Sequence, residues 1–385
     1  MTYVFLILGA VGHVILWVML VNRLHAIHMN RTLIDVLTLL CGVAVAGVPL
    51  PVAVAIYWGW PDGVGAGSTA WYAAWSYLAA SALVAVVAAL RRASTLLHPE
   101  RRGALVANHT THVKLRDDGP LAAPGFASWL ARLPFNEAFD LTVHEEQLVI
   151  PRLAGYYEGL RIAHLSDLHM SGRIAKTFFE RMVELVNRCE PDLVAITGDI
   201  VEREHCLDWI PDTLGRLRAA AGVYYVLGNH DRHADKAGLH AALADSGLIY
   251  AGGRWLSVTV RDVPLVVAGN ELPWHPPAAD LSDCPARNED GTPLRILLSH
   301  SPDQFGWAQK QDVDLMLAGH SHGGQVCLPL VGPILAPCRQ GVRYASGAFR
   351  AGNTVLHVSR GTSCLTPLRF NCPPEIALLV LRTVE

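Results

Sequence analysis

The chain has 385 residues and a mass of 41.8 kDa, which is more than one ordinary domain usually holds, so two or three structural units are expected. Hydrophobic residues make up 51% of the chain and charged residues only 17%, which excludes a disordered protein and is unusually apolar for a purely soluble one. The 31 Lys and Arg residues against 34 Asp and Glu give a net charge of −3, so no overall basic field indicates a nucleic-acid partner.

Three long apolar segments without a charged side chain lie before residue 91. They cover residues 3–21, 36–60 and 71–90, and each is long enough to cross ~30 Å of hydrocarbon, which takes roughly 20 helical residues. Pro49 and Pro51 predict a kink or an early helix end in the second segment. A cleavable signal peptide followed by buried helices is the alternative, but Met1 and Thr2 offer no basic region of the kind such a peptide needs. We therefore predict a transmembrane helical region over residues 1–92 with about three spans.

The arginines between the spans predict the orientation of the chain in the membrane. Arg23 and Arg31 follow the first span, and Arg91 and Arg92 follow the third, whereas residues 61–70 contain no Lys or Arg. Positively charged loops remain in the cytoplasm, so we expect a multi-pass protein whose amino terminus is outside and whose remaining part is cytoplasmic. A reducing cytoplasm would leave the eight cysteines as thiols.

Residues 93–141 are predicted to form a juxtamembrane connector. Phe126, Trp129, Leu130 and Leu133 fall on one face at helical spacing within it. Two readings of this short helix remain open: it lies on the lipid surface, or it packs on the domain that follows.

From about residue 142 onward one pattern recurs, an apolar run of strand length followed at once by polar residues. The predicted strands cover residues 161–166, 193–197, 223–227, 295–299 and 315–318. The polar residues that follow them are Asp167 and His169; Asp199; Asn229, His230 and Asp231; His300; and His320 and His322. Helical stretches separate the strands, which predicts a mostly parallel sheet whose polar residues gather beyond the carboxyl ends of the strands.

The helical pattern stops after residue 323. Four apolar runs separated by Gly and Pro turns follow, at residues 326–330, 343–348, 354–359 and 376–382. We expect these runs to form a second sheet stacked on the first. Residues 142–385 would then be one catalytic domain.

The polar residues at the strand ends are suited to binding metal ions. Carboxylate, imidazole and amide groups supply oxygen and nitrogen donors that suit Mn, Fe or Zn. So many donors at one rim are too many for one ion but suit two divalent ions that share a carboxylate. Two such ions ~3.5–4 Å apart clamp the attacking and leaving oxygens of a phosphoryl displacement, and they lower the pKa of a bound water toward ~7, which creates a hydroxide nucleophile. Gly198, Gly228 and Gly319 would permit the sharp turns that aim the ligands.

The five blocks, in this order, resemble those of the calcineurin-like metallophosphoesterases, and the resemblance extends over residues 142–385. The sequence around Asp167 and around His320, with the late Ser359-Arg-Gly361 element, is similar to the membrane-associated bacterial branch, which includes proteins similar to UDP-2,3-diacylglucosamine pyrophosphatases. The resemblance implies an α/β fold, a four-layer sandwich of two mixed β-sheets flanked by helices, and a location in the cell inner membrane.

The resemblance also implies a role for each residue. Two groups of ligands would each bind one ion and share the bridging carboxylate of Asp199. The groups are Asp167, His169 and His322 for the first ion, and Asn229, His300 and His320 for the second. His230 would donate a proton to the leaving oxygen or stabilise the charge of the transition state, and Asp231 would orient His230 or a metal-bound group. Glu202 departs from the family, because many members have Asp at that place.

These observations predict a membrane-anchored, metal-dependent hydrolase. We expect hydrolysis of a phosphodiester or pyrophosphate bond in a phosphorylated small-molecule or lipid substrate, with the lipid bilayer as partner and no nucleic acid. The alternatives are a phosphomonoesterase or protein phosphatase, a non-catalytic metal-binding interaction module, and a transporter or sensor. The complete ligand set together with His230 favours an enzyme, and the nearly uncharged spans favour a passive anchor.

Overall fold

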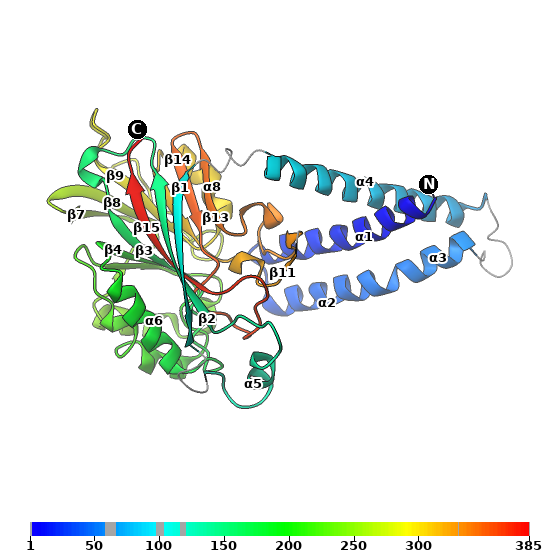
Figure 1. Cartoon of the computed structure of the whole chain (residues 1–385), viewed down its shortest axis with the longest axis horizontal. Coiled ribbons are helices and arrows are strands. Elements are labelled where there is room, and N and C mark those ends of the chain that lie inside the picture. The colour runs from blue at the N-terminus through cyan, green and yellow to red at the C-terminus, as the bar shows by residue number, and fades with distance from the viewer. Residues whose placement is uncertain (1, 58–66, 98–103, 116–120, 330, 385) are drawn as a thin grey trace. The chain divides into compact units, whose positions relative to one another are not determined.

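The computed structural model describes residues 2–57, 67–97, 104–115, 121–329 and 331–384 of the chain (Figure 1). The chain divides into two compact units, Met1–Arg101 and Arg102–Glu385. Each unit is described by itself below.

The described secondary-structure elements of the amino-terminal unit are all helices. Its helices are α1 (Thr2–His25), α2 (Arg31–Gly47), α3 (Pro49–Tyr57) and α4 (Thr69–Leu97). Three stretches are long and apolar enough to cross a membrane, namely Tyr3–His25, Thr32–Ile56 and Thr69–Ser94, in agreement with the three predicted spans. The break between α2 and α3 falls directly before Pro49, as the two prolines predicted. Residues 58–60, the end of the second predicted span, lie outside the described residues.

A buried histidine connects three helices of this unit. The Nδ1 atom of His13 on α1 lies 2.5 Å from the hydroxyl of Tyr77 on α4, and its Nε2 atom lies 3.1 Å from the backbone oxygen of Val45 on α2. Gly12 lets α1 approach α4 closely, because a Cβ there would overlap the backbone of Ser81. Small residues and interhelical hydrogen bonds are the usual means of packing helices in a membrane.

The carboxyl-terminal unit contains two large mixed sheets. The first has seven strands in the order β1-β2-β15-β3-β4-β5-β6, and the second has six in the order β13-β14-β10-β9-β8-β7. The strands of the first are β1 (Leu105–Lys114), β2 (Asp140–Val149), β15 (Glu375–Arg382), β3 (Arg161–Leu165), β4 (Leu193–Thr197), β5 (Val223–Val226) and β6 (Ile249–Tyr250). Those of the second are β13 (Gly347–Ala351), β14 (Thr354–Val358), β10 (Leu315–Ala318), β9 (Leu294–Ser299), β8 (Val263–Asn270) and β7 (Trp255–Val260). A small hairpin of β11 (Cys327–Leu328) and β12 (Gly332–Pro333) lies apart from both sheets.

The described part of the unit also contains four α-helices. They are α5 (Phe126–Ala131), α6 (Lys176–Arg188), α7 (Lys236–Asp245) and α8 (Phe305–Lys310). Three apolar cores separate the four layers of the unit. The first lies between the seven-stranded sheet and α6 and α7, the second between the two sheets, and the third between the six-stranded sheet and α8.

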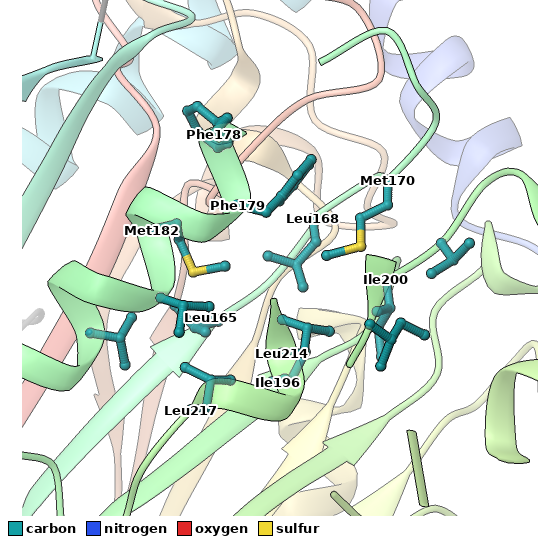
Figure 2. Close-up of a cluster of buried hydrophobic side chains, with 14 of the residues drawn as sticks. Leu165, Leu168, Met170, Phe178, Phe179, Met182, Ile196, Ile200, Leu214 and Leu217 are labelled. Carbon is teal, nitrogen blue, oxygen red and sulfur yellow. The ribbon is translucent and has the colours of Figure 1, made fainter. Parts of the chain in front are cut away.

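The alternation of side chains along each strand builds these cores. On β4, Val194 and Ile196 belong to the first core, whereas Leu193 and Ala195 belong to the second, between the sheets. Figure 2 shows the first core, where Phe179 and Met182 of α6 lie among apolar side chains of the sheet. Burying each large apolar side chain contributes roughly 1.5–3 kcal/mol. The expected four-layer α/β sandwich is therefore confirmed.

The structure corrects the expected division of strands between the sheets. The second sheet does not begin after residue 323, because β7, β8, β9 and β10 already belong to it, and β15, which was expected in it, lies in the first sheet between β2 and β3. An apolar run specifies a buried strand but not its neighbour, so its sheet depends on non-local pairing.

The expected connector also contains regular structure. β1 pairs antiparallel with β2 and forms an edge of the seven-stranded sheet. On α5, Leu130 is buried, but the Phe126 and Trp129 rings stack on each other with centroids 5.7 Å apart and stay exposed. The predicted apolar face is therefore divided between packing on the domain and exposure.

Candidate metal centre

The turns that carry the predicted site residues all follow carboxyl ends of strands. β3, β4 and β5 run parallel in the first sheet, and β9 and β10 run parallel in the second. Because the two sheets pack face to face, the turns of one meet the turns of the other at a common rim. The candidate site thus takes its side chains from both sheets.

The first cluster of candidate ligands consists of Asp167, His169 and His322. One ligand atom of each lies within 4.8 Å of the others. The Nε2 atom of His322 lies 3.3 Å from Oδ1 of Asp167 and 3.0 Å from Nε2 of His169. Asp167 and His169 are buried, and these three groups could hold one metal ion.

The second cluster consists of Asp199, His300 and His320, whose ligand atoms also lie within 4.8 Å of one another. The Nε2 atom of His300 lies 3.2 Å from Oδ2 of Asp199 and 3.0 Å from Oδ1 of Asn229, which brings Asn229 to the same place. The same Oδ2 of Asp199 lies 3.7 Å from Nε2 of His169, a member of the first cluster. Asp199 therefore lies between the two clusters, where a bridging ligand is needed.

Two buried polar atoms of the clusters fit a bound cation. Among the described residues, Oδ1 of Asp167 and Nε2 of His320 are buried without a hydrogen-bond partner. Leaving such an atom unsatisfied costs about 1–3 kcal/mol, so native structures usually provide a partner. The Nδ1 atom of His300 lies 2.7 Å from the backbone oxygen of Thr197, which leaves Nε2 for a metal. The donor set of oxygen and nitrogen atoms suits Mn, Fe or Zn.

Five candidate ligands share an unusual backbone conformation. The φ angle is 55° at Asp167, 46° at His169, 54° at Asp199, 69° at His320 and 50° at His322. The left-handed region is sparsely populated by residues other than glycine, and such strain costs about 1–3 kcal/mol per residue. Strained residues of this kind gather at functional sites, where the surrounding structure holds them in place.

The glycines of the turns serve two different purposes. Gly198 has a φ of 87°, which fits the sharp turn that the sequence predicted. Gly228 and Gly319 are needed for space instead. A Cβ atom at Gly228 would overlap the carboxylate of Asp199, and one at Gly319 would overlap the side chains of Ser166 and Asp167.

Glu202 connects the candidate acid to a candidate ligand. Its Oε1 atom lies 2.6 Å from Nδ1 of His230 and 2.7 Å from Nδ1 of His169. Burial raises the pKa of Glu202, but the hydrogen bonds from the two histidines outweigh it and hold the pKa at about 2. The backbone N–H of His230 also donates to Oδ1 of Asp199 at 2.8 Å. The departure from the family at position 202 therefore lies at the centre of the site.

Asp231 supports the Asp199 turn. Its carboxylate accepts four backbone N–H bonds of 2.7–3.1 Å, from Asp199, Ile200, Val201 and Gly228. These bonds fix the position of the carboxylate that lies between the two clusters. Asp231 thus orients a candidate metal ligand, and its orientation of His230 stays a prediction.

Two further residues contact the site. Trp274, in the insertion after β8, is buried, with its ring centroid 4.7 Å from that of His320 and 5.5 Å from that of His300. Arg369 is fully buried, and its guanidinium lies 3.4 Å from Nδ1 of His322. Sequence reasoning missed Arg369, because it lies in an irregular segment far along the chain from its partner and no spacing marks it. Arg360, the arginine of the Ser359-Arg-Gly361 element, forms an ion pair with Glu375 at 2.6 Å.

The comparisons with known proteins show the family of the chain. The family model described as calcineurin-like phosphoesterase matches residues 160–324. The uncharacterized metallophosphoesterase YkuE of Bacillus subtilis (strain 168) is 31% identical over 245 residues, covering 60% of this chain and 81% of that protein. Phosphodiesterase YaeI of Escherichia coli (strain K12) is 29% identical over 247 residues, 61% of this chain and 88% of that protein.

A vertebrate protein matches as well. The transmembrane protein with metallophosphoesterase domain of Danio rerio is 27% identical over 268 residues, which cover 64% of this chain and 59% of that protein. The chain belongs to the calcineurin-like metallophosphoesterase family. It is therefore a phosphoester hydrolase by class, in a family that generally uses a dinuclear metal centre.

Proposed function

We propose that this chain is a membrane-anchored, dinuclear-metal-dependent phosphoesterase that hydrolyses a phosphodiester or pyrophosphate bond. The observation that carries the proposal is the position of Asp199 between two ligand clusters, with His230 beside it. In this proposal Asp167, His169 and His322 would hold one ion, Asn229, His300 and His320 would hold the other, and both would share Asp199.

The two ions, Mn, Fe or Zn, would supply activation of water and stabilisation of charge on the phosphoryl group. The remaining steps belong to the side chains. Because Nδ1 of His230 contacts Glu202, the protonated ring would present its Nε2–H to the leaving oxygen. Trp274 covers His300 and His320 and limits the access of bulk water from that side.

The membrane association of the substrate is part of the same proposal. Three helices are long and apolar enough to cross a bilayer, so the chain is kept near lipid. The printed name of the relative from Danio rerio, a transmembrane protein with this domain, supports anchoring, and that of YaeI, a phosphodiesterase, supports diester hydrolysis. We infer that residues 1–92 anchor the chain in the cell inner membrane, that the catalytic domain is cytoplasmic, and that its substrate is linked to a lipid.

The experiment uses the purified full chain in lipid nanodiscs loaded with Mn²⁺. Bound metal is counted, and turnover is measured with an aryl phosphodiester, an aryl phosphomonoester and a UDP-linked lipid pyrophosphate. The proposal expects two ions per chain and turnover of the diester or the pyrophosphate. Turnover of the monoester alone would support the phosphomonoesterase alternative, and bound metal without turnover of any substrate would exclude an enzyme for these bonds.

A further inference from the structure

The catalytic unit exposes a group of large apolar side chains, which we call the apolar rim. The rim consists of Phe126, Trp129, Phe135, Val326, Leu328, Val331 and Leu335. Phe126 is 71% exposed, Trp129 58% and Phe135 80%, so its aromatic side chains are mostly in contact with solvent. Single exposed apolar residues are ordinary, but a connected group of them marks a surface for protein or lipid.

Contacts between distant segments connect the members of the rim. The ring of Phe135 meets that of Phe370 edge-on with centroids 6.4 Å apart. Phe370 in turn forms a parallel bridge with Val326, and its backbone N–H donates to Gln325 at 3.0 Å. The segment that carries Phe135 is therefore attached to the hairpin of β11 and β12.

A buried amide holds α5 in the same group. The Nδ2 atom of Asn136 donates to the backbone oxygens of Leu130 and Pro367, both at 2.8 Å. Its Oδ1 atom accepts the backbone N–H of Arg369 at 3.0 Å. Asn136 thus connects the end of α5 to the segment before Phe370, and the segment around Phe370 joins the two segments that carry the rim.

The two segments that carry the rim contain arginine but no acidic residue. Residues 121–136 and 322–353 contain four arginines and no Asp, Glu or Lys, although the chain has 34 acidic residues. The arginines are Arg132, Arg339, Arg343 and Arg350, and all four are exposed. Acidic groups also lie nearby, because Glu137 follows Asn136 and the carboxylate of Asp303 accepts the backbone N–H of Arg339. Exposed aromatic rings beside cationic side chains are typical of surfaces that enter the interface of a membrane containing anionic lipid.

The rim adjoins the candidate metal centre. Val326 follows His322 by four positions, and the loop between them contains Gly323 and Gly324. Arg369, the neighbour of Phe370, donates to the backbone oxygen of His322 at 3.5 Å. A partner surface that contacts the apolar rim would therefore lie next to the segment that carries His322.

We propose that the apolar rim inserts into the surface of an anionic phospholipid bilayer. The inference rests on the anchoring proposed above, because spans formed by α1 to α4 would keep lipid within reach of the catalytic unit. The aromatic side chains enter the boundary between headgroups and acyl chains, and the arginines bind the phosphates of the headgroups. The inference goes beyond hydrolysis, because it concerns how the domain is held at the membrane and not what it cleaves.

Brominated lipid tests this contact without any measurement of turnover. The full chain and a Trp129→Phe variant are placed in nanodiscs whose phosphatidylcholine carries bromine on the acyl chains, with phosphatidylglycerol added. The difference between their emission spectra isolates Trp129 from the other tryptophans. We expect acyl-chain bromine to quench this component, because an inserted ring lies ~5–10 Å into the boundary between headgroups and acyl chains. An unquenched component would overturn the proposal and would fit a protein partner instead.

A matched control tests whether contact is confined to the rim. Tyr156, in the short 3-10 helix η3 (Gly155–Tyr157), is 64% exposed and lies outside the rim. The emission component that a Tyr156→Trp substitution adds in the Trp129→Phe background should be unchanged by bromine. Equal quenching at both positions would overturn a specific docking face. Quenching of Trp129 that is unchanged without phosphatidylglycerol would overturn the role given to the arginines.

Discussion

The Oε1 atom of Glu202 lies 2.6 Å from Nδ1 of His230. The same oxygen lies 2.7 Å from Nδ1 of His169, so one carboxylate orients both the proposed acid and a proposed metal ligand. In this arrangement a change at position 202 affects proton transfer and metal binding together, whereas a change at His230 affects proton transfer alone. The two effects can be separated experimentally.

Replacing His230 by Ala should lower kcat by about 10²–10⁴-fold, the usual contribution of a positioned acid or base. Bound metal should stay nearly unchanged, because His230 is not one of the seven proposed ligands. Turnover of the aryl phosphodiester and metal content are measured on the same preparation. A variant with normal turnover would support the non-catalytic alternative, and a variant without metal would place His230 among the ligands.

Glu202→Gln should lower metal affinity and activity by about 10–100-fold, because a neutral amide holds the two imidazoles less firmly than a carboxylate. Glu202→Asp, which restores the residue that many family members have, should retain most of the activity. Glu204→Gln is the matched control, since Glu204 is exposed two positions away. Metal titration and kcat are the measurements. Equal losses in the Glu202→Gln and Glu204→Gln variants would contradict this role.

Gly319→Ala should reduce metal binding and stability, because the added Cβ overlaps the side chains of Ser166 and Asp167. Overpacking of this kind costs about 1–3 kcal/mol. Gly306→Ala is the control, since a Cβ at Gly306 on α8 meets nothing within 4 Å and should leave both properties nearly unchanged. Thermal unfolding with and without metal provides the measurement, and an unaltered Gly319→Ala variant would contradict the steric reading.

Glu146 should make the stability of the catalytic unit depend on pH. Burial and the nearby Glu375 raise the pKa of Glu146 from 4.5 to about 7, although Arg360 acts in the opposite sense. Between these values the folded state holds a proton that the unfolded state has released, so stability falls as pH rises through this window. The shift corresponds to a loss on the order of 3 kcal/mol above pH 7.

The Glu146→Gln variant cannot ionise and should lose this part of the pH dependence. Its Tm should exceed that of the unmodified chain at pH 8 and approach it at pH 5. The neighbouring Glu145, which is about half-buried on the same strand, provides the control variant Glu145→Gln. Parallel pH profiles for the unmodified chain and the Glu146→Gln variant would show that Glu146 is ionised in the folded protein.

The candidate ligand turns could be predicted from the sequence because their signals are local. An apolar strand followed by a glycine and a carboxylate, as at Gly198 and Asp199, indicates both the strand and the place where its turn projects a ligand. The three spans were equally predictable, since length and the absence of charge suffice. The pairing of strands could not be predicted in this way. β15 lies in the first sheet because it pairs with β2 and β3, which are more than two hundred residues away in the sequence.

The supporting contacts of the site could not be found in this way. Arg369 approaches His322 only because the folded chain brings these two distant positions together. No local sequence pattern around either residue indicates the other. Glu202 was noticed only as a departure from the family, and the fact that it serves two histidines depends on distances in space. Non-local contacts of this kind become visible only in the folded chain.

Each candidate ion takes groups from both sheets: Asp167 and Asp199 follow strands of the first, and His300 and His322 follow strands of the second. The affinity for the ions therefore depends on how closely the two sheets pack against each other. A smaller residue at Leu298, in the core between the sheets, would weaken ion uptake without touching any coordinating atom. Conversely, uptake of the ions would clamp the two halves of the sandwich together.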